Sequence, residues 1–312
     1  MRLKLFMFIV LTACAGVSDI ACDSGSGPGG DPGYFAFFTG GEFIQSDGTY
    51  SFSHEISPFL IARYEATYSL WRTVHVWATD TARGSGIYVF ANQGREGHDG
   101  TEGAAPTAAQ NEPVTTVSWR DAVVWCNAYS EMDGFVPVYY SDAGFTAVIR
   151  DSGDSNAAAC DAAFADWDAD GYRLPTEGEW QYAAGYIDGG EWTPWNCISG
   201  DSAPQYSSDT AVDYAWFDEN SQETTHDTGR KSANAAGIYD MSGNVSEWCW
   251  DWYGAYPTDS ADYRGPGSGS NRAARGGHWG IGGASARVGS RGMAYPYFTG
   301  GTMGFRIARN PR

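Results

Sequence analysis

One short segment of this 312-residue chain has the residue types and spacing of a calcium-binding loop. Residues 166–177 read DWDADGYRLPTE, which places carboxylates at loop positions 1, 3, 5 and 12, where an EF-hand coordinates Ca²⁺. The loop pattern is complete, but an EF-hand also needs a helix that enters the loop. The preceding residues give only a weak, Ala-rich helix candidate, and Pro175 occupies position 10. We therefore interpret this segment as a turn that leads into a helix.

The other side chains that could carry chemistry are scattered along the chain. The five histidines show no spacing typical of metal ligands, and the four cysteines beyond the N-terminal region form no CxxC pair. Neither a zinc site nor a thioredoxin-like redox pair is indicated, and the sequence places no nucleophile or base. These residues are His54, His75, His98, His226 and His278, with Cys126, Cys160, Cys197 and Cys249.

The composition excludes some partners and indicates a core built on aromatic rings. The net charge is −19, and phosphate binding needs clustered Lys and Arg, so no nucleic-acid partner is expected. Aromatic residues are abundant, with 13 Trp and 19 Tyr. No acidic residue follows Asp262, although eight arginines do. We expect these arginines to pair inward with acidic loops; the alternative is a basic binding face.

The N-terminal residues resemble a bacterial lipoprotein signal peptide. Arg2 and Lys4 precede the apolar run LFMFIV, which is too short for a transmembrane helix. The following LTAC resembles a lipobox in which Cys14 becomes the lipidated first residue, with Cys22 as the alternative. We predict a signal peptide at residues 1–13 and an exported protein that is lipid-anchored at the bacterial outer membrane or cell surface.

The remaining chain reads as a tether followed by one domain. Residues 14–33 are rich in Gly, Ser and Pro, which is typical of a flexible tether. Residues 34–312 show no second linker. Within them, 35–38 and 59–62 have the apolar character of strands, and 84–110 is polar and Gly-rich, as in a long surface loop.

Two helices have clear start signals. Ser118 and Asp121 fit a capping box, and Thr176 and Glu179 fit another. Apolar residues then follow the first of these at helical spacing on one face. A third, weaker helix is predicted from about 68 to 77.

Five motifs resemble those of the formylglycine-generating-enzyme (sulfatase-modifying factor) family, in the family's order. They are NEPVTTVSW at 111–119, GYRLPTEGEW at 171–180, NAAGIYDMSGNVSEW at 234–248, and the closing pair RAARGGHW at 272–279 and GFRIAR at 304–309. The resemblance covers nearly the whole domain. It implies an α+β fold of the C-type-lectin-like kind, with little regular secondary structure, two main helices, small twisted sheets and long loops.

The resemblance does not extend to the family's oxidative chemistry. Active members carry two cysteines between the closing motifs, because soft Cu(I) needs soft thiolate ligands. The aligned positions here are Ile281 and Ala286. Relatives without these cysteines use iron held largely by histidines of an extra helical domain, for which this sequence shows no counterpart. No catalytic residue is therefore predicted.

The family also implies a structural calcium site. In related enzymes the matching segment helps to hold Ca²⁺, so Asn244, the carbonyl of Val245 and Glu247 are candidate ligands. The alternative is that Asn244 and Glu247 hydrogen-bond buried backbone. No cofactor is required by either interpretation.

Residues 276–303 differ in composition from the corresponding stretch of ordinary members. They include nine glycines, no acidic residue and no lysine. This resembles proteins diversified by retroelements, including spirochaete lipoproteins, in which mutated AAC or AAT codons yield Gly, Ala, Ser, Thr, Ile, Tyr, Phe or His, but never Lys, Glu, Met or Trp. The residues reachable in this way are predicted to form a variable ligand-binding face: His278, Gly280, Ile281, Gly283, Ala284, Ser285, Ser290, Ala294, Tyr295, Tyr297, Phe298, Thr299, Gly300 and Thr302. The interleaved residues that look structural include Trp279, Arg287, Val288, Arg291, Pro296 and Met303.

The sequence thus predicts a non-catalytic, surface-anchored protein whose C-terminal segment binds an unidentified protein or other cell-surface ligand. Rigid aromatic side chains beside small neighbours are typical of such binding faces. Two alternatives stay open. The first is a family enzyme with a different metal-dependent oxidative activity. The second is a structural envelope lipoprotein without a ligand.

Overall fold

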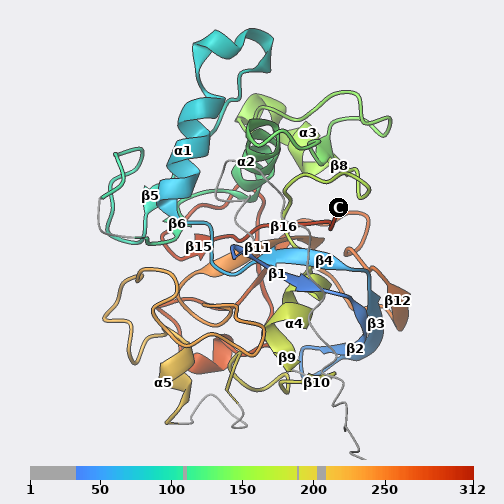
Figure 1. Ribbon diagram of the computed structural model, residues 1–312, viewed down its shortest axis with the longest axis vertical. Helices are drawn as coiled ribbons and strands as arrows, with labels where there is room; N and C mark the ends of the chain where they lie inside the picture. Colours follow the sequence, from blue (N-terminus) through green and yellow to red (C-terminus); the bar gives the residue numbers. More distant parts are fainter. Residues whose placement is uncertain (1–32, 108–110, 188–189, 202–208) are drawn as a thin grey trace, which may run out of the picture.

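The computed structural model describes residues 33–107, 111–187, 190–201 and 209–312 (Figure 1). The predicted signal peptide, both candidate lipidation sites and nearly all of the predicted tether lie outside the described residues. No helix within the described ranges is long and apolar enough to cross a membrane.

The predicted helices are confirmed, together with their caps. In α2 (Trp119–Met132), Ser118 Oγ accepts from the backbone N–H of Asp121, whose carboxylate accepts from the N–H of Ser118. In α4 (Glu177–Gly185), Thr176 and Glu179 make the same reciprocal pair. Helix α1 (Tyr68–Ala78) was the weakest of the three predictions, yet it is longer than α4. Shorter helical turns are α3 (Ala157–Asp161), α5 (Ala211–Tyr214), and the 3₁₀ turns η2 (Thr81–Gly86), η3 (Asp154–Asn156) and η4 (Gly283–Ser285).

The strands form small sheets, as the resemblance implied. The largest has the order β14-β13-β11-β15; two further sheets have the orders β1-β4-β16 and β12-β3-β2, and three are two-stranded pairs. In the largest sheet, β11 pairs antiparallel with β13 and parallel with β15. The strands are β1 (Phe35–Phe38), β2 (Gly41–Ser46), β3 (Ser51–Ile56), β4 (Phe59–Ala62), β5 (Arg95–Glu96), β6 (Val114–Thr115), β7 (Tyr139–Tyr140), β8 (Phe164–Ala165), β9 (Tyr186–Ile187), β10 (Glu191–Trp192), β11 (Ser246–Trp252), β12 (Asp259–Ala261), β13 (Arg272–Arg275), β14 (Gly292–Ala294), β15 (Met303–Gly304) and β16 (Ala308–Arg309).

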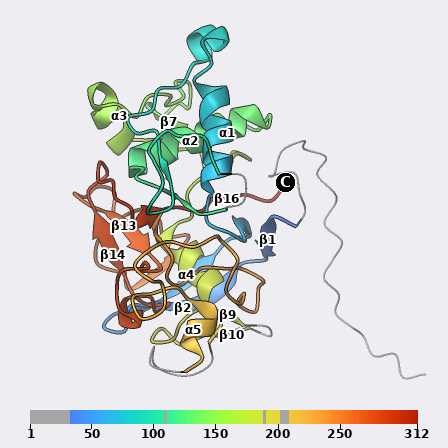
Figure 2. The same ribbon diagram turned by 90° about the vertical axis from the view of Figure 1, so that its left-hand side faces the viewer.

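Helices α1, α2 and α3 gather at one end of the molecule, and α5 lies near the other (Figure 1). The three larger sheets and α4 lie between them. In the side view, β13 and β14 form one flank of the molecule (Figure 2). The predicted surface loop at 84–110 is confirmed over most of its described length, which holds only the end of η2 and the two-residue strand β5.

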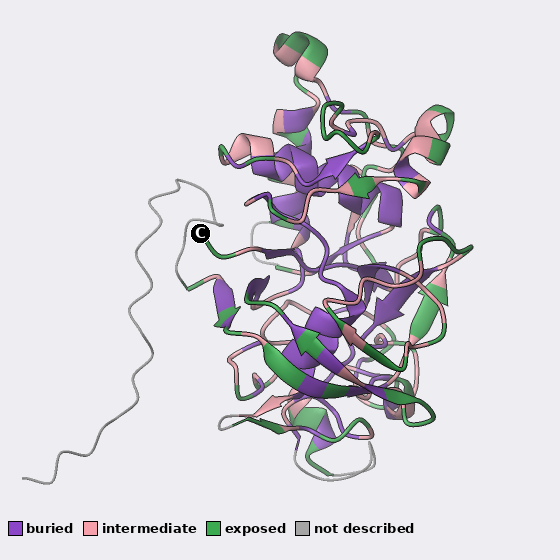
Figure 3. Ribbon diagram, turned by 90° about the vertical axis from the view of Figure 1, so that its right-hand side faces the viewer, coloured by how far each residue is buried: buried purple, intermediate pink, exposed green. Residues whose placement is uncertain are grey.

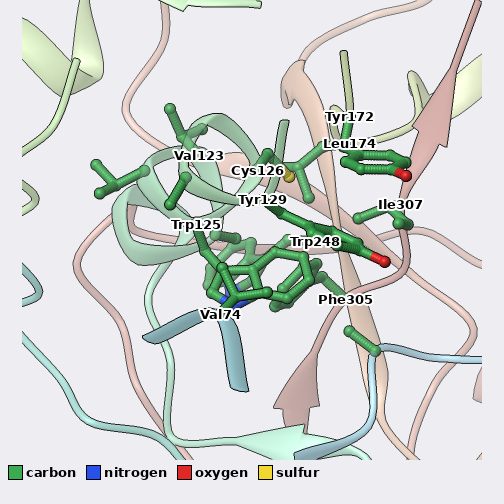
Figure 4. Packing of buried hydrophobic residues seen from close by; sticks show 14 of the residues in the cluster. Val74, Val123, Trp125, Cys126, Tyr129, Tyr172, Leu174, Trp248, Phe305 and Ile307 are labelled. Atoms are coloured by element: carbon green, nitrogen blue, oxygen red, sulfur yellow. The ribbon is translucent and has the colours of Figure 1, made fainter. Parts of the chain in front are cut away.

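The core is aromatic, in agreement with the composition. Trp71 of α1 stacks on Trp125 of α2 with ring centroids 5.9 Å apart, and Phe305 packs edge-on against both rings (Figure 4). A second buried cluster joins α4 to β1, β4 and β13 through Trp180 and its neighbours. Buried residues thus extend through both halves of the molecule (Figure 3). Their burial stabilises the fold, because each Å² of apolar surface removed from water contributes about 25 cal/mol. This continuous core gives the loops between β13 and β15 a rigid base.

Candidate functional site

A groove of about 940 Å³ opens over the largest sheet. Its floor includes Ser246 of β11, Ala274 of β13 and Met303 of β15, and β14 forms one side. The segment between β13 and β15 supplies most of the remaining wall. Nine of the fourteen predicted binding residues line this groove: His278, Ile281, Ala284, Ser285, Ser290, Ala294, Tyr295, Phe298 and Thr302.

The other five predicted residues lie outside the lining of the groove. Tyr297 is exposed and stacks parallel to Tyr295 with ring centroids 5.2 Å apart, so it extends the aromatic rim. Gly280 is exposed, and Thr299 and Gly300 are half-buried. Gly283 is buried in η4, so its position does not present it to a ligand.

Several groove residues were not predicted from the sequence. Asp47 and Thr49 come from the turn between β2 and β3, more than 200 positions before the variable segment. Met293 on β14 is 57% exposed and lines the groove. It was not in the predicted set, because mutated AAC or AAT codons never encode Met. The exposed edge of β14 could have indicated Met293, whereas nothing in the sequence places Asp47 here.

Buried arginines anchor this segment to α4. Arg291 makes a bidentate pair with Glu177, with Nε to Oε1 at 2.6 Å and Nη2 to Oε2 at 2.7 Å. Arg275 lies 3.5 Å from the same carboxylate and donates to the carbonyls of Val288 and Ser290, both at 2.8 Å. The inward-pairing interpretation of the arginines is therefore confirmed at both positions. One carboxylate at the start of α4 fixes the backbone of the groove wall.

The two side chains of the candidate calcium site are engaged by protein groups. Glu247 accepts from Trp180 Nε1 at 2.7 Å and from Arg306 at 2.6 Å on Oε2 and 2.5 Å on Oε1. Asn244 accepts from the N–H of His226 at 3.0 Å and donates to Glu65 at 2.6 Å. Asn244 thus bonds buried backbone, as the alternative expects, whereas Glu247 bonds side chains instead; calcium at this position stays a prediction. Within the described ranges, no group of three or more His, Cys, Asp or Glu side chains could hold a metal ion.

The carboxylates of the EF-hand-like segment do not converge on one point. Asp170 accepts from the N–H of Val136 and pairs with Arg312, while Glu177 pairs with Arg291 beneath the groove. The interpretation as a turn before a helix is therefore confirmed.

Cys126, Cys160, Cys197 and Cys249 are buried and lie outside the groove lining. Burial raises the pKa of Cys160 to about 12 and raises the pKa values of Cys126 and Cys249 strongly, which keeps all three protonated. At the positions of the family's cysteine pair, Ile281 lines the groove and Ala286 is fully buried. The site thus offers an apolar side chain where the enzymes offer a thiolate.

Three comparisons with known proteins bear on this site. The family described as Sulfatase-modifying factor enzyme 1-like domain matches residues 34–311. The structure of Treponema denticola variable protein 1 is similar over 89% of this chain and 95% of its own, with a TM-score of 0.69 and 30% identity.

Two relatives by sequence have different names. The protein from Paenibacillus barcinonensis called Chaperone protein LppX is 31% identical over 278 residues, which is 84% of this chain and 85% of the relative. The formylglycine-generating enzyme of Streptomyces coelicolor is 34% identical over 165 residues, which is 47% of this chain and 49% of that enzyme.

Proposed function

This chain belongs to the sulfatase-modifying factor enzyme 1-like family, and within that family we propose that it is a non-catalytic ligand-binding protein rather than an oxidase. One observation carries the proposal. Fourteen residues were predicted because mutated AAC or AAT codons can encode them. Thirteen of these are exposed or half-buried, and nine line a single groove. Of the other fourteen residues of 276–303, six line the groove, so the predicted set is the more frequent class at this surface.

The chemistry of the groove favours binding over oxidation. Ile281 and Ala286 stand where the resemblance places a thiolate pair that would hold copper, and Cys126, Cys160 and Cys249 are buried and protonated. The similarity to a variable protein of Treponema denticola supports the same conclusion. The ligand is held by the chain's own side chains, with no cofactor required, and a structural calcium ion at Asn244 and Glu247 is kept as a separate hypothesis.

The ligand that fits best is a protein or another cell-surface molecule. Tyr295, Tyr297 and Phe298 give a rim of rigid rings, which bury a large area on binding and lose little conformational entropy. One relative is named a chaperone, and a chaperone's ligand is another polypeptide. Nucleic acid is disfavoured by the net charge of −19.

A photo-crosslinking experiment tests the binding face directly. An amino acid with a benzophenone side chain replaces Phe298 on the groove rim, or Val136 after α2 as the control, which is 51% exposed and outside the groove lining. Irradiation in the native host should give a specific adduct from position 298 and none from position 136. Equal adducts from both positions, or none from either, would contradict the proposal.

Diversification of this face by a retroelement has a test that needs no protein. The DNA downstream of the gene should contain a near-repeat of the segment that encodes 276–303, differing from it mainly at adenines, beside a reverse-transcriptase gene. If no such repeat exists, the segment is not variable in this way.

Surface anchoring through an N-terminal lipid completes the proposal. Labelling with radioactive palmitate should mark the wild-type chain and the Cys22→Ser variant, but not Cys14→Ser. Loss of label only in Cys22→Ser would identify Cys22 as the lipidated residue. A wild-type chain without label would contradict the lipid anchor.

Two other functions predict different outcomes. An oxidative enzyme with other metal ligands predicts stoichiometric and specific copper or iron binding by the purified protein. A structural lipoprotein without a ligand predicts that exchanging residues 295–302 alters stability only and leaves the crosslinking pattern unchanged.

A further inference from the structure

A second pocket, of about 480 Å³, lies apart from the groove and shares no lining residue with it. Five segments of the chain form its walls. They contribute Tyr34 before β1, Tyr64 after β4, the first turns of α1, and the Asn111 and Thr228 loops.

The walls of this pocket are held in place by backbone hydrogen bonds between the segments. The N–H of Arg63 donates to the carbonyl of Tyr34 at 2.9 Å, and the N–H of Thr228 donates to the carbonyl of Asn111 at 3.0 Å. Gly229 has φ of +75°, and a Cβ there would lie 2.7 Å from the ring of Tyr64. The pocket is therefore pre-formed, and it depends on a glycine that lets the Tyr64 ring approach.

The lining combines aromatic rings with neutral polar groups. None of the described residues that line the pocket is charged, in a chain where 18% of residues are. The ring of Tyr64 stacks on Tyr239 with centroids 5.0 Å apart. Within the described residues, the side chains of Ser69, Asn111 and Thr228 make no hydrogen bond, so hydroxyl and amide groups stand available beside the rings.

We propose that this pocket binds a neutral saccharide of one or two sugar units. A sugar presents apolar C–H faces that pack on aromatic rings and hydroxyls that both donate and accept, and the pocket offers a partner for each. Its volume is at the small end of the range typical of ligand sites. None of the described lining residues carries a carboxylate, so they offer the hydroxyl and amide groups directly to the sugar.

Charged and purely apolar ligands fit this lining less well. An anion would find no cation among the described lining residues and would lie near Asp227, which accepts from the N–H of Asn111. An apolar ligand would leave the hydroxyls and the amide of the lining without hydrogen-bond partners, which disfavours its binding.

Ligand-observed NMR on the purified protein tests this proposal. The probes are maltose, cellobiose and di-N-acetylchitobiose, with a chondroitin sulfate disaccharide as the charged comparison. At least one neutral probe should bind with a Kd of about 1–10 mM. Asn111→Ala should weaken that binding about tenfold, because the exposed amide can be removed without disturbing the core.

Two further variants locate the binding. Tyr64→Phe should retain most of the affinity because it keeps the ring, whereas Tyr295→Ala, in the groove, should leave the Kd unchanged. The proposal is overturned if no neutral probe binds at about 50 mM or if the sulfated probe binds more tightly. Loss of binding in Tyr295→Ala with none in Asn111→Ala would also overturn it, because the sugar would then occupy the groove.

Discussion

Two kinds of position alternate along residues 276–303, and three glycines illustrate the difference. At Gly277, with φ of +70°, a Cβ would lie 2.8 Å from the carbonyl oxygen of Ser285; at Gly289, it would lie 2.8 Å from the carbonyl oxygen of Trp195. Neither glycine is in the predicted variable set, and we call such positions fixed. At Gly280, which belongs to the predicted variable set, the nearest atoms are those of the His278 side chain, at 3.5 Å. A side chain is excluded at the fixed glycines and has room at the variable one.

The fixed positions hold the groove through its backbone, which explains how its side chains could be exchanged. Arg275 donates to the carbonyls of Val288 and Ser290, and the indole N–H of Trp279 donates to the carbonyl of Gly301 at 3.0 Å. A carbonyl is present whatever side chain its residue carries. The scaffold therefore specifies the path of the chain and leaves the composition of the groove surface open.

The largest effect should follow from breaking the buried scaffold at Glu247. Glu247 and Arg306 are both fully buried, so Glu247→Ala leaves a guanidinium without its partner. We expect the free energy of unfolding to fall by about 3–5 kcal/mol, measured by urea denaturation. The control is Asp170→Ala, whose pair with Arg312 is partly exposed and should contribute less than about 1 kcal/mol. Equal losses in the two variants would show that the buried pair contributes no more to stability than the partly exposed pair.

A buried histidine gives the scaffold a pH dependence. His54 donates from Nδ1 to Gln45 and accepts at Nε2 from the N–H of Tyr263 at 2.8 Å, an arrangement that requires the neutral ring. Burial lowers the pKa of His54 to about 4. Because the pKa is lower in the folded than in the unfolded state, this stability is present above about pH 6.5 and is lost as the pH falls through 4.

The expected loss from His54 is roughly 3 kcal/mol between pH 7 and pH 4 or below. Asp240 acts in the opposite direction, since burial raises its pKa to about 6, so wild type must be compared with His54→Gln. The variant should lose less stability than wild type on acidification, as measured by urea denaturation at several pH values. Identical pH profiles, or an NMR titration of His54 near pH 6.5, would contradict the assignment.

The sequence predicted the parts of this structure that depend on local chemistry. The capping boxes at Ser118 and Thr176 satisfy backbone donors within one turn, so their residues alone indicate a helix start. The EF-hand-like segment shows the limit of such patterns. Its Glu177 pairs with Arg291, which lies 114 positions away in the sequence, so local spacing could not predict this partner. The contribution of Asp47 to the groove has the same non-local origin.

A smaller effect should distinguish the two classes of glycine. Gly277→Ala forces a Cβ against backbone in a left-handed conformation and should lower the free energy of unfolding by about 2 kcal/mol. Gly280→Ala should change it by less than about 0.5 kcal/mol. Thermal unfolding of both variants is the measurement. If the two variants lost the same stability, the distinction between fixed and variable positions would have no structural basis.

The smallest effect on stability should come from the largest change in sequence. Replacing the eight predicted residues that line the groove other than Phe298, which carries the benzophenone, by other residues of the same codon class alters much of its surface but no scaffold contact from Arg275, Arg291 or Trp279. Most of these side chains are half-exposed, and surface substitutions shift stability by about 0.5 kcal/mol or less. We expect urea denaturation to show a summed loss of about 1 kcal/mol or less, while the crosslinking partner at position 298 changes or disappears. The matched control replaces an equal number of exposed residues outside the groove and should retain that partner. A loss comparable to that of Glu247→Ala would mean that the groove side chains hold the fold together, and the groove would then belong to the scaffold.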